Sequence, residues 1–172
     1  MPVAAGFVVL VAGCGAHPPA PAAVSSARPD PGAAPSSSVT GLAALDPCAL
    51  LSTVDRSTAG LSAPGQGRTI GGNRACDWTQ TGVYGLTITL DDRTALADLT
   101  VAEGTGQRLR IGRHPAIKVS DTAAGDGTCA VLLSAGDNAS AQVDVTNSGF
   151  SDTTLACDRA GTVARLIEPE LP

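Results

Sequence analysis

Apolar and polar residues alternate along several short stretches of the chain, and this alternation predicts β-strands. In residues 86–90, Leu and Ile alternate with Thr, and in residues 139–146, Ala and Val alternate with Ser, Gln, Asp and Thr. A two-residue period buries one face of a strand and leaves the other accessible. Residues 129–133 form a continuous apolar run, which is typical of a central strand. Further strands are expected at 75–79, which would be the first of the chain, at 109–111 and at 116–119.

Helix-capping residues predict two short helices in the first half of the folded part. A first helix is expected at 46–51, where Asp46 can cap free N–H groups and the following Pro loses no hydrogen bond at the first helical position. Asp91 or Asp92 is expected to cap a second short helix over 95–99, in the middle of the chain.

A last helix is expected after Asp152, which can cap its first turn. Its apolar stripe would consist of Ala156, Ala160, Val163 and Ile167. Residues 62–73, rich in Gly and polar residues, predict a loop, and 136–138 predict the turn of a hairpin. Short turns between strands, with short helices near the N-terminus, in the middle and at the C-terminus, predict an α+β fold built on an antiparallel sheet.

The N-terminus has the pattern of a bacterial lipoprotein signal. Residues 3–12 are apolar, and this run of ten residues is about half of what a membrane-spanning helix needs. The run ends in small residues and Cys14, so residues 1–13 are expected to be a signal peptide. Cys14 would carry a diacylglycerol on its thiol and begin the mature protein, with two acyl chains for stable anchoring. The alternative is a Cys that follows an apolar N-terminus by chance.

No Lys or Arg precedes this apolar run, which departs from the usual signal pattern. The only positive charge before it would be the α-amino group of Met1. A translation start upstream of Met1 would supply the missing basic residues and would make the signal longer.

Residues 14–41 are expected to be a disordered tether that begins with the lipidated Cys. Residues 15–40 hold six Pro, seven Ala and five Ser, so this stretch cannot bury enough apolar surface to offset its ordering entropy. Residues 42–172 have the composition of one globular domain of the commonest size. The chain is thus expected to consist of a signal peptide, a tether and a single folded domain.

Four cysteines remain besides Cys14, and an even number behind an export signal predicts disulfides in an oxidising space. Three pairings are possible. We favour Cys48 with Cys76 and Cys129 with Cys157, because each pair is separated by 28 residues and would tie a helix to a strand. A zinc site is the alternative, but the sequence has no Cys-x-x-Cys pair and no His near these cysteines.

The sequence offers little for catalysis. A nucleophilic triad needs a His that takes a proton from Ser or Cys, and His114 is the only His outside the tether. No Gly-x-Ser-x-Gly elbow accompanies it. His114 is therefore interpreted as a surface residue in a turn between two strands, and a general base is the alternative. We expect no enzymatic activity and no metal or cofactor beyond the diacylglycerol on Cys14.

Three neighbouring arginines, Arg108, Arg110 and Arg113, form a candidate anion-binding site. Arg108 and Arg110 would share one face of a strand, and the cluster could bind an anionic ligand or an acidic partner. A solvated polar face of the sheet is the alternative. The net charge of −5 and the scarcity of aromatic residues argue against nucleic acid as a partner.

Several short motifs together resemble a known family. They are the Cys14 signal, the Ala/Pro/Ser tether, residues 46–51, Cys76-Asp77-Trp78, the turn at 112–116, Cys129 and the helix with Cys157. This combination resembles a family of actinobacterial lipoproteins known as domain of unknown function 3558, over residues 42–166. The resemblance implies an exported, lipid-anchored domain, and it supplies no catalytic residues and no established activity.

These observations favour a lipoprotein held at the outer face of the cell membrane. The leading hypothesis is a non-catalytic binding or sensing module, attached to the membrane by its anchor, whose partner is an envelope protein or a small ligand. An accessory or structural role in an envelope protein complex is the second hypothesis, and a hydrolase of unfamiliar type is the third. An apolar pocket would favour a small ligand, whereas a flat exposed apolar patch would favour a protein partner.

Overall fold

Seven β-strands and two α-helices make up the part of the chain that the computed structural model describes, residues 40–172. In chain order, with η for a 3-10 helix, the elements are η1 (Gly41–Ala44), α1 (Thr53–Ala59), β1 (Gln66–Ile70), β2 (Asn73–Gln80), β3 (Tyr84–Asp91), η2 (Leu96–Asp98), β4 (Gly106–Ile111), β5 (His114–Val119), β6 (Thr128–Ser134), β7 (Ser140–Asn147), α2 (Thr153–Ile167) and η3 (Glu168–Glu170). The expected signal peptide, Cys14 and the tether up to residue 39 lie outside the described residues. The predicted α+β class is confirmed.

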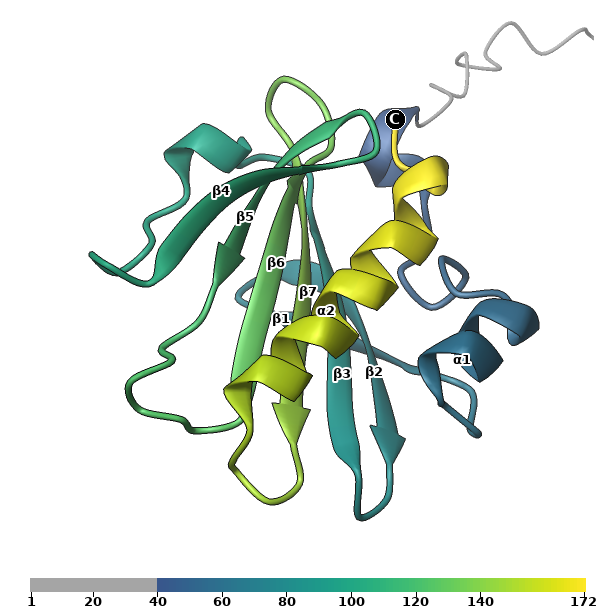
Figure 1. Cartoon of the computed structure of the whole chain (residues 1–172). Helices are drawn as coiled ribbons and strands as arrows, with labels where there is room; N and C mark the ends of the chain where they lie inside the picture. Colours follow the sequence, from purple (N-terminus) through teal and green to yellow (C-terminus); the bar gives the residue numbers. More distant parts are fainter. Residues whose placement is uncertain (1–39) are drawn as a thin grey trace, which may run out of the picture. The chain divides into compact units, whose positions relative to one another are not determined.

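The strands form one antiparallel sheet in the order β1-β2-β3-β7-β6-β5-β4 (Figure 1). Two meanders, β1-β2-β3 and β4-β5-β6-β7, meet where β3 pairs with β7, from Tyr84 opposite Asn147 to Asp91 opposite Ser140. The connection from β3 to β4, residues 92–105, therefore carries the chain from the centre of the sheet to its far edge.

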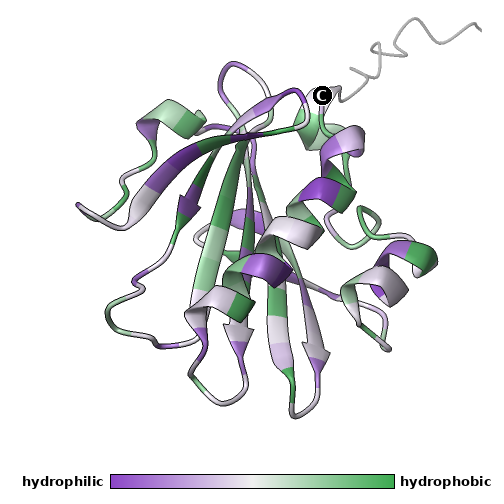
Figure 2. Ribbon diagram, viewed as in Figure 1, coloured by the Kyte–Doolittle hydropathy of each residue, from purple (hydrophilic) through white to green (hydrophobic). Residues whose placement is uncertain are grey.

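One face of the sheet packs against α2, which crosses it over β6 and β7 (Figure 1). Every second residue of β3 and of β7 is buried, as the alternating pattern predicts. Asp152 caps α2, since its Oδ1 accepts a hydrogen bond from the Leu155 N–H (3.0 Å). Figure 2 shows apolar residues along the strands beneath this helix. The helix buries the whole predicted stripe: Ala156, Ala160, Val163 and Ile167.

The two disulfides join the pairs expected from their equal spacing. Cys129 on β6 is bonded to Cys157 on α2, so this disulfide ties a strand to a helix as predicted. Cys76 on β2 is bonded to Cys48, which lies in a turn. The first disulfide therefore fixes a loop to the sheet, whereas the second fixes the helix layer to the sheet.

The helix expected at 46–51 is wrong, because this stretch forms turns and α1 begins only after Ser52. Asp46 accepts a hydrogen bond from the Cys48 N–H (2.9 Å), so it caps a turn. Ser52 and Asp55 form a capping box: Ser52 Oγ accepts from the Asp55 N–H (3.1 Å), and Asp55 Oδ2 accepts from the Ser52 N–H (3.0 Å). Because of this reciprocal cap, the helix begins at Thr53, several residues after the start that was expected from Asp46.

β1 lies within residues 62–73, which the sequence predicts to be a loop, so 75–79 belongs to the second strand of the chain. All five residues of β1 are exposed, and the strand is held by main-chain pairing with β2, from Gln66 opposite Asp77. A strand without a buried face has no apolar alternation to reveal it. The helix expected at 95–99 is likewise reduced to a single 3-10 turn, η2.

The connection from β7 to α2 is held by the buried side chain of Asn147. Its Nδ2 donates to the carbonyl oxygens of Ser151 (3.0 Å) and Asp152 (2.9 Å), and its Oδ1 accepts a hydrogen bond from Arg159. Phe150 and Asp152 have φ angles of 47° and 62°, in the left-handed region that non-glycine residues seldom adopt. The hydrogen bonds of Asn147 thus hold together a turn in which two residues adopt unfavourable φ angles.

Replacing Asn147 with Ala is expected to lower the free energy of unfolding by about 2 kcal/mol, because two carbonyl groups and a guanidinium lose a buried partner. Urea denaturation followed by circular dichroism measures this loss. Ser148→Ala is the matched control, since Ser148 is exposed and its hydroxyl makes no hydrogen bond within residues 40–172. Equal stability of the two variants would show that Asn147 does not hold the turn.

Candidate functional site

A groove of about 590 Å³ lies between the connection from β3 to β4 and the strands β4 and β5. Figure 1 shows η2, part of this connection, beside these two strands. The volume falls in the range of about 300–1,000 Å³ that is usual for small-molecule sites. Most lining residues are apolar, among them Leu96, Leu99, Val101 and Ile117, and the charged ones are Arg108 and Asp137.

Strand register places Arg108 and Ile117 of the groove on the face of the sheet opposite α2. Arg108 pairs with Ile117, and Ile117 pairs with Leu132, so these three side chains share a face. The adjacent residues Ala116 and Leu133 pair with each other on the opposite face and belong to the core under the helix. The groove also touches Leu109 and Ala116, which pair with each other on the α2 face, so a ligand would contact these strands as well as the side chains of the Arg108 face.

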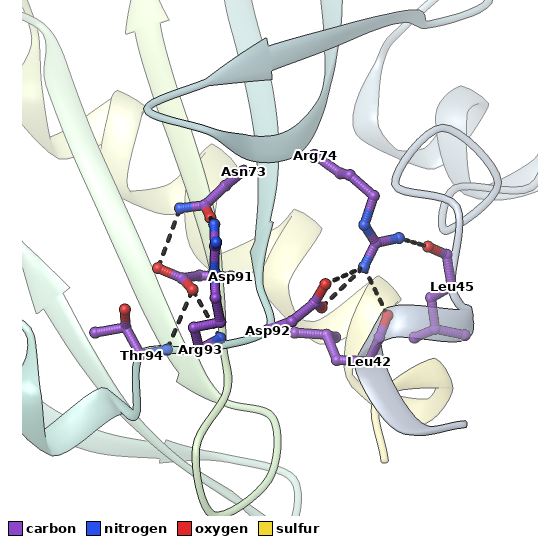
Figure 3. A network of polar contacts seen from close by, with 8 residues as sticks. All are labelled: Leu42, Leu45, Asn73, Arg74, Asp91, Asp92, Arg93 and Thr94. Carbon is purple, nitrogen blue, oxygen red and sulfur yellow. Dashed lines mark hydrogen bonds and ion pairs between the residues drawn. The ribbon is translucent and has the colours of Figure 1, made fainter. Parts of the chain in front are cut away.

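The groove wall at residues 95–101 is positioned by Asp91 at the end of β3 (Figure 3). Its Oδ1 accepts hydrogen bonds from the N–H groups of Arg93 (2.9 Å) and Thr94 (3.1 Å), and its Oδ2 accepts from Nδ2 of Asn73 (3.0 Å). Desolvation raises the pKa of Asp91, but these hydrogen bonds together outweigh it and hold the pKa below its usual value. The charged carboxylate fixes the direction in which the chain leaves the sheet.

Arg74 on β2 ties the start of the folded part to the same turn (Figure 3). Its Nη2 donates to both carboxylate oxygens of Asp92 (2.8 and 3.1 Å) and to the Leu42 carbonyl oxygen (3.0 Å). Its Nη1 donates to the Leu45 carbonyl oxygen. Asp91 or Asp92 was expected to cap a helix. Instead, Asp91 caps a turn and Asp92 pairs with Arg74.

Arg108 is the sequence-predicted site residue that lies in the groove. Its side chain is exposed and makes no hydrogen bond or ion pair with any residue of the described part, 40–172. A guanidinium presents its donors in a planar fork that matches a carboxylate or a phosphate. The groove therefore combines an apolar wall with one cation that has no partner among the described residues.

Arg110 and Arg113 do not join Arg108 in the groove. Nη2 of Arg110 donates to the carbonyl oxygen of Arg113. Arg113 in turn holds the C-terminal segment, since its Nη2 donates to the Leu171 carbonyl oxygen (2.6 Å) and its N–H donates to Glu168 Oε1 (3.0 Å). The structure thus divides the three arginines into one groove residue, Arg108, one that holds the C-terminal segment, Arg113, and one that bonds to Arg113, Arg110.

His114 is buried at the start of β5, so the interpretation as a surface turn residue is wrong. The turn itself consists of Gly112 and Arg113. Nδ1 of His114 lies 2.7 Å from the Ser134 carbonyl oxygen, while Nε2 lies 3.1 Å from Arg113 Nε and 3.6 Å from Glu168 Oε1. Both ring nitrogens have partners, which leaves no free lone pair for a general base.

Asp144 on β7 is a half-buried carboxylate that no sequence motif pointed to. Burial raises the pKa of Asp144, and hydrogen bonds from Gln142 Nε2 to its two oxygens (2.8 and 2.9 Å) partly oppose this. The residue lines a smaller hollow of about 310 Å³ together with Val119 and Ala130. In the sequence it is only one polar position of an alternating strand, indistinguishable from Gln142. Its partner is an amide, so the two do not form an acid–base pair.

Residues 40–172 contain no group of three or more His, Cys, Asp or Glu side chains arranged to hold a metal ion. None of the helices in the described part combines the length and the apolar character needed to cross a membrane.

Similarity to known proteins identifies the family of the chain. No curated protein and no solved structure matches it significantly. The family described as "Protein of unknown function (DUF3558)" matches residues 9–170, which is nearly the whole chain. This stretch includes Cys14, all four disulfide cysteines and every residue that lines the groove. The chain therefore belongs to the DUF3558 family.

Proposed function

We propose that this protein is a lipid-anchored module that binds a small ligand at the outer face of the cell membrane without transforming it. The groove beside β4 and β5 carries this proposal, because its volume and mostly apolar lining are typical of small-molecule sites. Arg108 adds a polar contact that would orient the ligand.

The cysteines support a location outside the membrane. Cys14 follows a short apolar run, as the lipidated residue of a bacterial lipoprotein does. Two disulfides persist in an oxidising space and would be reduced in the cytosol. As a polyproline II helix, the 26 residues from 15 to 40 would reach about 80 Å, taking about 3.1 Å for each. The groove would then meet molecules that are dissolved in the space above the bilayer.

The hydrogen bonds of the candidate acid–base residues support a binding function rather than a catalytic one. Both nitrogens of His114 are engaged, and the carboxylate of Asp144 is hydrogen-bonded to an amide. A general base needs a free lone pair within reach of the proton that it takes. A guanidinium offers hydrogen-bond donors and no acceptor, so Arg108 in the groove can bind an anion and cannot remove a proton.

Blocking the groove tests the binding function. Ala97 is exposed and lines the groove, so Ala97→Trp would fill it, whereas Ala123→Trp adds the same side chain to an exposed turn. Each lipidated protein is purified in polymer-bounded membrane discs, and the small molecules retained with it are quantified by mass spectrometry. We expect one small molecule to be retained by the wild type and by Ala123→Trp, and to be absent from Ala97→Trp. The same retained molecules in all three proteins would overturn the proposal.

A further inference from the structure

We infer that the groove takes a single-chain amphiphile with one anionic end, of which a long-chain monocarboxylate is the simplest example. This inference rests on the proposed binding function and names the chemical class of the ligand. Three properties of the groove lead to it: the apolar wall, the unpaired guanidinium at one end and the carboxylate at the other.

The apolar wall selects an alkyl chain over a polar or aromatic ligand. Leu96, Leu99 and Val101 come from the connection that follows β3, and Ile117 comes from β5, so apolar side chains line both sides. None of the lining residues is aromatic, which leaves no ring for stacking on a sugar or a base. Each methylene buried against such a wall increases affinity by about fourfold.

The guanidinium of Arg108 selects an anionic end group. Arg108 has no hydrogen-bonding partner within the described residues, in contrast to Arg110 and Arg113, which bind main-chain carbonyls. Arginine binds a carboxylate or a phosphate through two parallel hydrogen bonds, and this pairing is stronger than a neutral hydrogen bond. The head group of the ligand is therefore placed at the Arg108 end of the groove.

Asp137 at the other end excludes a second anion. Arg108 lies opposite Ile117, which pairs with Leu132 of β6. Ser134 ends β6 about 7 Å further along the strand, at about 3.4 Å for each residue, and Asp137 lies beyond it in the turn to β7. The two charges thus mark opposite ends of the groove. A ligand with an anion at both ends would meet the Asp137 carboxylate, so the groove favours a monoanion.

Isothermal titration calorimetry of the full chain tests this ligand class. The chain carries Cys14→Ser, because the detergent or membrane lipids that surround the lipidated protein would compete for the groove. It is exported so that its disulfides form. Dodecanoate below its micelle concentration is expected to bind one to one. Arg108→Gln should weaken the binding about tenfold, whereas Arg110→Gln, on the same strand but outside the groove, should leave it unchanged.

Dodecanedioate and dodecanol separate the contributions of the two ends. Dodecanedioate should bind the wild type about threefold more weakly than dodecanoate, and Asp137→Asn should remove this difference. Dodecanol should bind the wild type and Arg108→Gln equally. Binding of dodecanoate that does not depend on Arg108 would overturn the inference, as would Arg108-dependent binding of phosphatidylglycerol vesicles with no binding of free dodecanoate.

The outcomes for the ligand class and for the binding function are distinguishable. If Ala97→Trp removes a retained molecule from the lipidated protein but dodecanoate does not bind, the ligand class is wrong and the binding function stands. If Ala97→Trp removes nothing, the binding function itself fails.

Discussion

Replacing Cys14 with Ser is expected to release the protein from the membrane. The thiol is the atom that would receive the diacylglycerol, and Ser cannot replace it in a thioether. The apolar run at residues 3–12 is about half as long as a spanning helix, so the lipid is expected to supply the membrane attachment. The variant should therefore move from the detergent phase to the aqueous phase in a Triton X-114 separation, and its intact mass should lack two acyl chains.

A matched variant shows whether the thiol itself is responsible. Ala16→Ser adds the same hydroxyl two residues after Cys14 and keeps the thiol, so it should remain in the detergent phase with the wild type. If Cys14→Ser stayed membrane-bound with an unchanged acyl mass, the lipid would be attached elsewhere. The alternative interpretation, a Cys that follows an apolar N-terminus by chance, would then hold.

Much of the fold could be predicted because its elements carry local patterns. The strands at 86–90 and 139–146 have one buried face, and burial of alternate residues is visible in the sequence as alternation. The last helix combines Asp152 as a cap with an apolar stripe at helical spacing. The equal spacing of the cysteines pointed to the pairing that the structure shows.

Two incorrect predictions concern segments whose conformation is decided by hydrogen bonds to neighbouring residues. β1 has no buried face, and main-chain bonds to β2 keep it in the sheet. At 46–51 a single Asp suggested a helix, but the Ser52–Asp55 capping box determines the start. In both cases the deciding interaction is a hydrogen bond that composition and periodicity do not record.

The candidate site was only partly visible in the sequence. Arg108 was recognised as a possible anion ligand, but its neighbours Arg110 and Arg113 were indistinguishable from it without their main-chain partners. The wall at 95–101 resembled a short helix because its apolar residues have a spacing that also suits one. A groove forms only where this wall meets β5, and contact between distant segments has no local pattern.

Removing the disulfide between β6 and α2 is expected to have the largest effect on stability. Replacing both Cys129 and Cys157 with Ala should lower the free energy of unfolding by about 3–4 kcal/mol, because the unfolded chain gains the entropy of an open loop with a sequence separation of 28. A domain of this size has a total stability of about 5–15 kcal/mol, so the loss is a large share of it. Urea denaturation of the full chain, with Cys14→Ser in both proteins, measures the difference.

The position of this disulfide in the fold explains why its loss should also loosen the helix. Cys129 is buried on β6, and its bond fixes α2 to the sheet that the helix covers. Dithiothreitol provides the control: it should destabilise the wild type by breaking both disulfides, and the double variant by breaking only Cys48–Cys76. A double variant as stable as the wild type would contradict the expected stabilisation by this disulfide. The α2 packing would then rest on the apolar stripe alone.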